Sequence, residues 1–152
     1  MANMSYSALA PFVCILLLAI CSISQTLPEP DSDAAEDGRL VRLRFKVHIT
    51  NGFPNNVHPF IATCRSHDDY LGTHTLWKNG EFRFKFMVHF WKTTHFTCNV
   101  TWGPKSLENI SVFKNGVETR SCKRTGNCFW KGQEDGIYFC NNNQSYFKKY
   151  SW

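Results

Sequence analysis

The sequence predicts a small antiparallel β-sandwich of about eight strands, held together by disulfide bonds. Two ten-residue segments, 41–50 and 81–90, alternate between apolar and polar side chains, as a strand does when one of its faces is buried. Turn-forming pairs, among them Asn51-Gly52 and Asn79-Gly80, separate these segments from further short apolar stretches. Because no segment has a convincing helical period, two packed sheets are the economical architecture.

Residues 1–24 are predicted to be a secretory signal peptide. An apolar run, 12–23, precedes a cleavage position after Ser24, and Ser22 and Ser24 place small side chains three and one positions before the cut. The run is shorter than the roughly 20 apolar residues that a transmembrane helix needs, and no later segment is long and apolar enough to span a bilayer. We therefore expect a secreted, extracellular protein without a transmembrane segment.

Residues 25–38 are predicted to be an acidic, disordered linker, which leaves 39–152 as one folded domain. The stretch 28–37 has five acidic residues and no large apolar side chain, so burial cannot offset the entropy lost on ordering. All 17 lysines and arginines, but only seven of the 12 acids, follow Asp37, an excess of ten positive charges. Outside the cell such a surface points to an acidic cell-wall polysaccharide or a membrane surface rather than a nucleic acid. The plainer interpretation is that the charge only keeps the protein soluble.

The two alternating segments assign side chains to the inside and the outside of the sandwich. In the segment 41–50, the side chains expected to face the core are Val41, Leu43, Phe45, Val47 and Ile49. In the segment 81–90, they are Phe82, Phe84, Phe86, Val88 and Phe90. The opposite faces are basic, and we expect His48 and His89 to be exposed on them.

Six further strands are predicted: 60–65, 95–102, 109–113, 127–131, 137–140 and 145–150. In the segment 95–102, Cys98 shares one face with Phe96 and Val100, whereas Asn99 is on the other. We therefore expect Cys98 in the core and Asn99 at the surface.

Three strings in the chain resemble a known family. They are CRSHDDYLG at 64–72, FWKTTHFTCNVTWG at 90–103 and CKRTGNCFW at 122–130, followed by EDGIYF and a terminal KYSW. In this order they resemble the plant self-incompatibility proteins, also called S-protein homologues, over about 41–152. The resemblance implies a small β-sandwich and a secreted protein that a cell-surface partner recognises. In the founding activity of that family, a pistil protein is recognised on the pollen surface and self pollen is rejected.

Five cysteines follow the predicted leader, and in a small secreted domain they favour a disulfide framework over a metal site. Sequence alone leaves 15 arrangements of two bonds and one free thiol. The resemblance selects Cys64, Cys98, Cys122 and Cys128 as the bonded set. Within it we expect Cys64 to pair with Cys98 on a neighbouring strand and Cys122 with Cys128 as a local link. Cys140 stays open between a buried free thiol, an intermolecular bond and another partner within the chain.

Three sequons predict N-glycosylation, at Asn99, Asn109 and Asn143. A glycan must project into solvent. Asn99 meets this condition by its strand face, and Asn143 by its position in a polar turn.

We expect no cofactor, metal or catalytic residue. Cys64 and His67 have the spacing of one zinc-ligand pair, but the chain lacks a second pair. A ribonuclease would use two histidines and a cation, and His89, Lys92 and His95 lie close together in the sequence. The two histidines are predicted on different strands, so this alternative is disfavoured, and the resemblance brings no catalytic residues.

Recognition is expected in a loop, because a rigid sandwich presents its variable chemistry at its ends. The candidate is 131–136, a charged tip in which Lys131, Gln133, Glu134 and Asp135 would meet the partner. It also fits an ordinary solvated turn. An alternative function, a carbohydrate-binding module, would stack sugars on the tryptophans at 77, 91, 102, 130 and 152.

Overall fold

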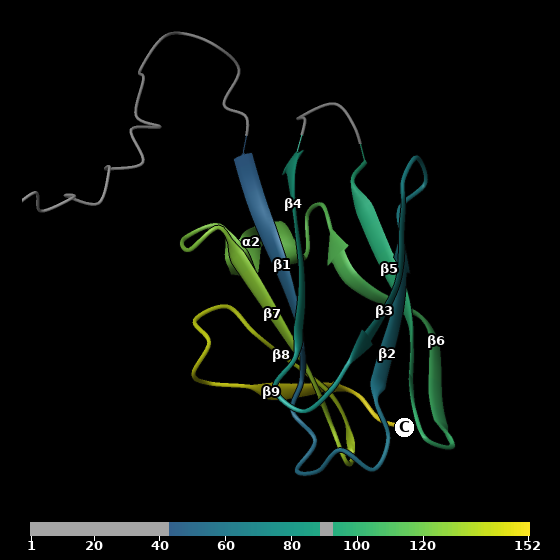
Figure 1. The fold of residues 1–152 in the computed structure, drawn as a ribbon. Coiled ribbons are helices and arrows are strands. Elements are labelled where there is room, and N and C mark those ends of the chain that lie inside the picture. The colour runs from purple at the N-terminus through teal and green to yellow at the C-terminus, as the bar shows by residue number, and fades with distance from the viewer. Residues whose placement is uncertain (1–42, 89–92) are drawn as a thin grey trace, which may run out of the picture. The chain divides into compact units, whose positions relative to one another are not determined.

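The computed structural model describes residues 43–88 and 93–152, which form two packed β-sheets (Figure 1). The predicted leader, the predicted linker and the predicted side chains at 41, 89 and 90 lie outside the described residues. Nine strands and a short helix make up the described part. The expected class, a small β-sandwich with disulfide bonds, is confirmed.

The first sheet has five strands in the order β4-β1-β7-β8-β9. Their bounds are Leu43–Asn51 for β1, Glu81–Val88 for β4, Asn127–Gln133 for β7, Gly136–Cys140 for β8 and Phe147–Tyr150 for β9. β1 runs antiparallel to β4 but parallel to β7, so the expected purely antiparallel arrangement was wrong at this pair. A parallel neighbour requires a long crossover, and here the chain passes through the second sheet before it enters β7.

The second sheet has four strands in the order β3-β2-β5-β6. Their bounds are Phe60–Arg65 for β2, Tyr70–Leu76 for β3, His95–Trp102 for β5 and Lys105–Lys114 for β6. β3 was not predicted, because it is an edge strand whose mostly polar residues show no apolar alternation. β6 begins four residues earlier than predicted, because Gly103 at φ 55° permits a tight turn directly after β5.

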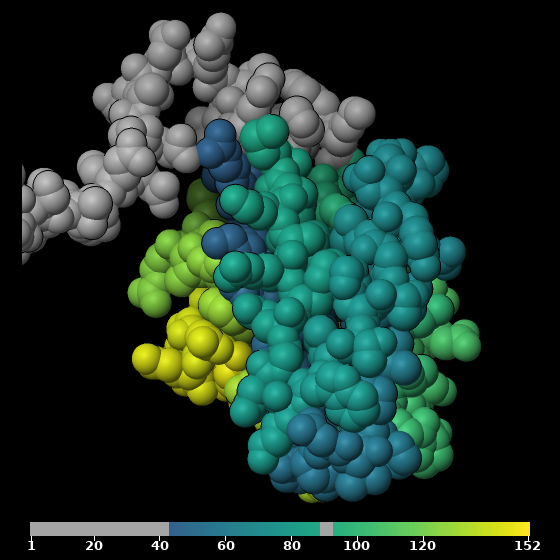
Figure 2. All heavy atoms as spheres, viewed as in Figure 1, coloured from purple at the N-terminus to yellow at the C-terminus, as the bar shows by residue number. Residues whose placement is uncertain are grey.

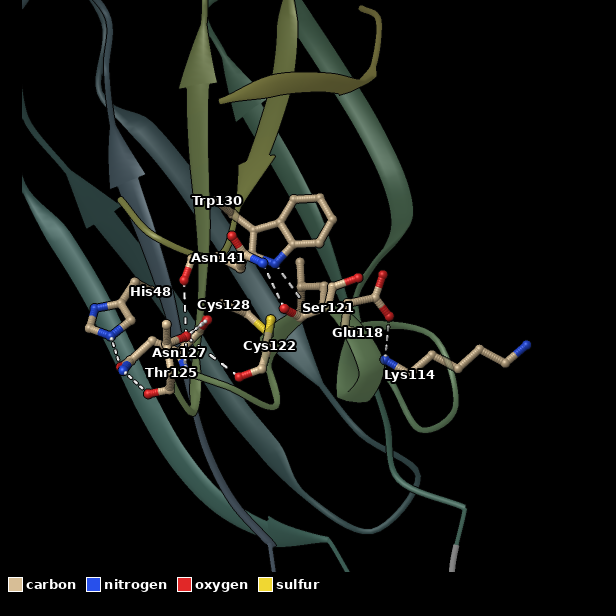
Figure 3. The surroundings of a disulfide bond; sticks show 11 residues. His48, Lys114, Glu118, Ser121, Cys122, Thr125, Asn127, Cys128, Trp130 and Asn141 are labelled. Atoms are coloured by element: carbon tan, nitrogen blue, oxygen red, sulfur yellow. Dashed lines mark hydrogen bonds between the residues drawn. A yellow bond between two sulfur atoms is a disulfide. The ribbon is translucent and has the colours of Figure 1, made fainter. Parts of the chain in front are cut away.

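Helix α2 (Glu118–Cys122) links β6 to β7 and was not predicted, since one turn is too short for a helical period. The buried carboxylate of Glu118 accepts a hydrogen bond from the Lys114 backbone N–H at 2.8 Å. Asn141 donates to the carbonyl of Ser121 at 2.7 Å, and Thr125 donates to the carbonyl of Asn141 at 2.9 Å (Figure 3). These bonds fix the turn that leads into β7.

The predicted inward side chains meet in one core between the sheets. Phe45, Val47 and Ile49 of β1 and Phe96 of β5 are buried. Trp130 of β7 is 1% exposed, and its indole N–H donates to the carbonyl of Val112 on β6 at 2.8 Å. A hydrogen bond therefore joins the two sheets inside the apolar layer.

His48 corrects the expectation of an exposed basic strand, because only 8% of it is exposed. Its Nδ1 lies 2.6 Å from a carboxylate oxygen of Glu81, and its Nε2 lies 3.0 Å from the amide oxygen of Asn127. The ring also stacks on Phe129 at 4.5 Å. β1 has a strand on each side, so longer side chains of β4 and β7 cover the outer face at this position.

Two disulfides join Cys64 to Cys98 and Cys122 to Cys128, the two pairs that the sequence analysis expected. The first links directly opposed residues of β2 and β5, and the second closes α2 onto β7. Cys140 is a buried free thiol. The structure thus agrees with the first of the three alternatives considered for Cys140, a buried free thiol.

Candidate recognition surface

Five segments come together at one end of the sandwich, the lower end in Figure 1. They are the β1–β2 loop (52–59), the β3–β4 turn (77–80), the β5–β6 turn (103–104), the β7–β8 turn (134–135) and the carboxyl terminus (151–152). We call this surface the loop end. It includes the tip of the predicted recognition loop, together with segments that the sequence analysis did not connect with it.

Aromatic side chains form a firm base beneath the loop end. The buried ring of Phe53 stacks on Trp102, with ring centroids 4.1 Å apart and planes at 6°. Trp152 packs against Phe53 at 6.3 Å and donates its indole N–H to the carbonyl of Gln133 at 2.7 Å. The carboxyl terminus is thereby attached to the β7–β8 hairpin, and the base is continuous across both sheets.

The β3–β4 turn is fixed by backbone hydrogen bonds. Gly80 donates to the carbonyl of Trp77 at 2.7 Å, and Asn79, at φ 63°, donates to the carbonyl of Asn51 at 3.0 Å. The Lys78 N–H donates to the side chain of Asn56 at 2.6 Å, which connects the turn to the β1–β2 loop. The two segments therefore form one rigid unit.

Two apolar side chains project from this unit into solvent. Trp77 is 52% exposed and Val57 is 69% exposed. Scattered apolar residues are ordinary on protein surfaces, but a tryptophan held out by a hydrogen-bonded turn loses little further freedom on binding. Such aromatic anchors supply much of the binding energy at protein interfaces.

The predicted recognition loop, 131–136, is smaller than the sequence analysis expected. Lys131 and Gln133 belong to β7 and are half-buried, and only Glu134 and Asp135 form the turn. The Lys131 ammonium lies 4.1 Å from the ring centroid of Tyr146. The pairing of β7 with β8 continues to Gln133 and Gly136, so only two residues form the tip and most of the predicted segment is strand.

Asp135 is held in place by its neighbours. It forms an ion pair with Lys148 and accepts a hydrogen bond from the Tyr138 hydroxyl at 2.8 Å. The hydrogen bond from Lys148, and secondly that from Tyr138, lowers the pKa of Asp135 below its usual value of 3.8. The same contacts raise the pKa values of Lys148 and Tyr138. Lys105 also donates to the carbonyl of Glu134. Glu134 is the side chain of the tip that remains without a partner among the described residues.

These contacts predict how the hairpin tip responds to acid. Because the pKa of Asp135 is lower in the folded state, its contribution to stability is complete above pH 3.8 and is lost as the pH falls further. NMR resonances of the Tyr138 ring should therefore report a transition below pH 3.8. Asp135→Asn should abolish the transition, and Glu134→Gln should retain it. A transition at or above pH 3.8 would contradict the assignment.

The three sequons lie at the surface, and their glycosylation stays a prediction. Asn99 and Asn109 are neighbours on the outer face of the four-stranded sheet, where the Asn109 N–H donates to the Asn99 side-chain oxygen at 2.8 Å. Asn143 accepts a hydrogen bond from the Tyr146 hydroxyl at 2.6 Å. The side-chain oxygen of Asn109 accepts a hydrogen bond from Arg65 at 3.4 Å. In all three side chains the bonded atom is therefore the amide oxygen, and not the nitrogen that would carry a glycan.

The alternative chemistries find no assembled site in residues 43–88 and 93–152. Cys64 is in a disulfide and cannot pair with His67 as a zinc ligand, and no group of three metal-binding side chains occurs in this part. His95 is hydrogen-bonded to Ser111 at 3.2 Å, while His89 and Lys92 lie outside the described residues. No helix in the same part is long and apolar enough to cross a membrane.

The four described tryptophans do not form a common platform for sugars. Trp130 is in the core, and Trp102 and Trp152 are half-buried in the base of the loop end. Trp91 lies outside the described residues. Among the described tryptophans, Trp77 alone is exposed. Its exposure could not be predicted, because tryptophans in so small a domain are usually buried.

Comparison with known proteins places the same region in a family. The model of the family described as plant self-incompatibility protein S1 matches residues 46–152. S-protein homolog 28 of Arabidopsis thaliana is 31% identical over 141 residues, which cover 91% of this chain and 89% of that protein. Self-incompatibility protein S1 of Papaver rhoeas is 28% identical over 105 residues, which cover 65% of this chain and 67% of that protein.

A solved structure has the same fold. It belongs to the self-incompatibility protein homologues, described as a widespread family of small, highly stable, secreted proteins from plants. The TM-score is 0.54 at 17% sequence identity, and the match covers 75% of this chain and 98% of that chain.

Proposed function

Because the chain belongs to the plant self-incompatibility protein S1 family, we propose that it is a secreted, non-enzymatic ligand for a receptor protein on a cell surface. Residues 1–24 are removed as a signal peptide in this proposal, 25–38 serve as a linker, and 39–152 carry the activity. Two disulfides in a domain of this size support an oxidising, extracellular location. The name of the Papaver rhoeas relative supports a role in recognition.

The receptor contacts the loop end. The observation that carries this proposal is the exposure of Trp77 and Val57 on a rigid unit next to the hairpin tip. An aromatic anchor beside charged groups is the usual composition of an interface centre and its rim. Glu134 supplies an uncommitted charge at the rim, and the Lys105 ammonium stays tied to the backbone of the tip.

Glycans would leave this surface free. Asn99 and Asn109 lie on the outer face of the four-stranded sheet and Asn143 lies in the β8–β9 connection, so none of the three sequons is in a segment of the loop end. Sugars at Asn99 and Asn109 would cover the outer face of the four-stranded sheet. Recognition through the loops is compatible with occupancy at all three sites.

Trp77→Ala should weaken binding of the purified protein to responsive cells by at least about tenfold, as expected when an interface anchor is truncated. Val57→Ser should weaken it less, because fewer apolar atoms are lost. Both variants should keep the melting temperature nearly unchanged, since the two side chains are exposed. Binding is measured with labelled protein on intact cells, and the melting temperature by calorimetry.

Val117→Ser is the matched control for Val57→Ser. Val117 is 48% exposed and lies next to α2, away from the loop end. The Val117→Ser variant should bind to responsive cells as the native protein does. Equal loss of binding for both serine variants, or native binding by Trp77→Ala, would remove the loop end from the receptor interface.

A further inference from the structure

A second surface lies on the outer face of the five-stranded sheet, near the beginning of β1 and the end of β4. Figure 2 shows side chains of these two strands next to one another at the surface. A groove of about 540 Å³ opens here, and these residues line it: Arg44, Phe45, Lys46, Lys85, Phe86, Met87, Thr125, Gly126 and Asn127. We call it the cationic groove. It is at the opposite end of β1 from the loop end.

Two lysines stand directly opposite each other in the groove. Lys46 of β1 pairs with Lys85 of β4 in the antiparallel ladder. The Lys46 N–H donates to the carbonyl of Gly126, on the side of β7, so Lys46 and Lys85 form a pair without hydrogen bonds between them. Side chains approach most closely in such pairs, and like charges placed there destabilise a sheet.

Among the described residues, none of those that line the groove is acidic. Arg83 extends the row of cations along β4, opposite His48, and the nearby carboxylate of Glu81 is engaged by that histidine. Within the described part of the chain, Lys46, Arg83 and Lys85 form no ion pair. The repulsion is therefore retained in the fold, and an anion from outside would relieve it.

We propose that the cationic groove binds a linear acidic polysaccharide built of uronate residues. Charge complementarity is the main argument, because cations repeat along two adjacent strands. Alternate residues of a strand lie about 6.6 Å apart and neighbouring strands about 4.8 Å, so a polymer with regularly spaced carboxylates meets several cations at once. The exposed side chain of Met87 supplies an apolar strip for the sugar rings.

The turn before β7 makes the groove a shaped site rather than a flat charged face. Gly126, at φ 67°, places its backbone against β1, and the Cys122–Cys128 disulfide anchors both ends of the turn. Thr125 and Asn127 are held by hydrogen bonds to the neighbouring backbone (Figure 3). The side of the groove formed by this turn is therefore fixed before binding, and a ligand needs to order little of the protein.

The test uses the full secreted chain with polygalacturonate as the probe, measured by titration calorimetry at low and physiological salt. Lys46→Gln combined with Lys85→Gln should weaken binding by about tenfold or more and reduce its dependence on salt. The same variant should be at least as stable as the native protein, because the opposed charges are removed. Fully methyl-esterified polygalacturonate, which has no charge, should not bind.

A matched control separates the groove from net charge. Lys114→Gln combined with Lys149→Gln removes the same charge from two exposed lysines outside the groove and outside the loop end, and it should bind polygalacturonate within about twofold of the native protein. Equal weakening by both double variants would overturn the proposal in favour of nonspecific attraction. Binding to vesicles containing phosphatidylserine but not to polygalacturonate would assign the groove to a membrane surface instead. Either result is independent of Trp77 and of receptor binding.

Discussion

Cys64→Ala should lower the free energy of unfolding by about 4 kcal/mol. The bond closes a loop of 34 residues, and chain entropy assigns about that value to a loop of this length. Small domains have stabilities of roughly 5–15 kcal/mol, so the variant should lose much of its margin. The substitution also leaves Cys98 as an unpaired thiol in the core.

Denaturant unfolding of matched variants checks this expectation. Cys64→Ala combined with Cys98→Ala removes the bond without leaving a reactive partner. Cys122→Ala combined with Cys128→Ala removes the disulfide that closes the short loop, whose cysteines are six residues apart. This variant should lower the free energy of unfolding by only about 2 kcal/mol. A smaller loss from the first double variant than from the second would contradict the entropic account. Peptide mapping that joined Cys140 to either cysteine of the long loop would show that the native framework differs.

Trp130→Ala should cost about 3–5 kcal/mol, the usual range for truncating a buried aromatic side chain to alanine. The ring fills the space between the sheets against Phe139 and Tyr150, and its N–H satisfies the carbonyl of Val112. The variant loses the packing and leaves a buried acceptor without its partner, which adds to the loss.

Trp130→Phe separates the stability lost through packing from the stability lost through the hydrogen bond to Val112. It keeps an aromatic ring in the site but removes the donor to Val112, so it should cost less than alanine while still destabilising by about 1–3 kcal/mol. Trp77→Ala serves as the control, since that side chain is half-exposed and should change stability little. Calorimetric unfolding measures all three. Similar losses from Trp77→Ala and Trp130→Ala would contradict the assignment of Trp130 to the core.

The sequence predicted those parts of the fold in which burial imposes a pattern. Alternation in β1 and β5 identified the core residues, because each strand has one face against the other sheet. β3 was missed for the same physical reason, since it is an edge strand with few buried side chains. The parallel pairing of β1 with β7 depends on a crossover between distant segments, and local patterns carry no information about it. His48 is buried by side chains from β4 and β7, which a single strand cannot reveal.

The candidate surface was predicted only in part. The charged tip at 131–136 was visible as a polar interval between two strands, but its partners Lys148 and Lys105 come from β9 and β6. The segments that carry Trp77 and Val57 are joined because the Lys78 N–H donates to the side chain of Asn56. The cationic groove likewise depends on the register between Lys46 and Lys85. Each of these arrangements follows from tertiary pairing and not from spacing along the chain.

The parallel contact of β1 with β7 also fixes an order of events during synthesis. All strands of the four-stranded sheet lie between Phe60 and Lys114, with only β4 of the other sheet inserted among them, so this sheet can close with its own disulfide while the rest of the chain is still being made. β1 must wait for β7, since Lys46 pairs with Asn127, 81 residues later, and such distant pairing is slow. Cys140 emerges after all four paired cysteines. If their bonds close in the order of synthesis, its thiol finds no open partner and is enclosed without cross-linking.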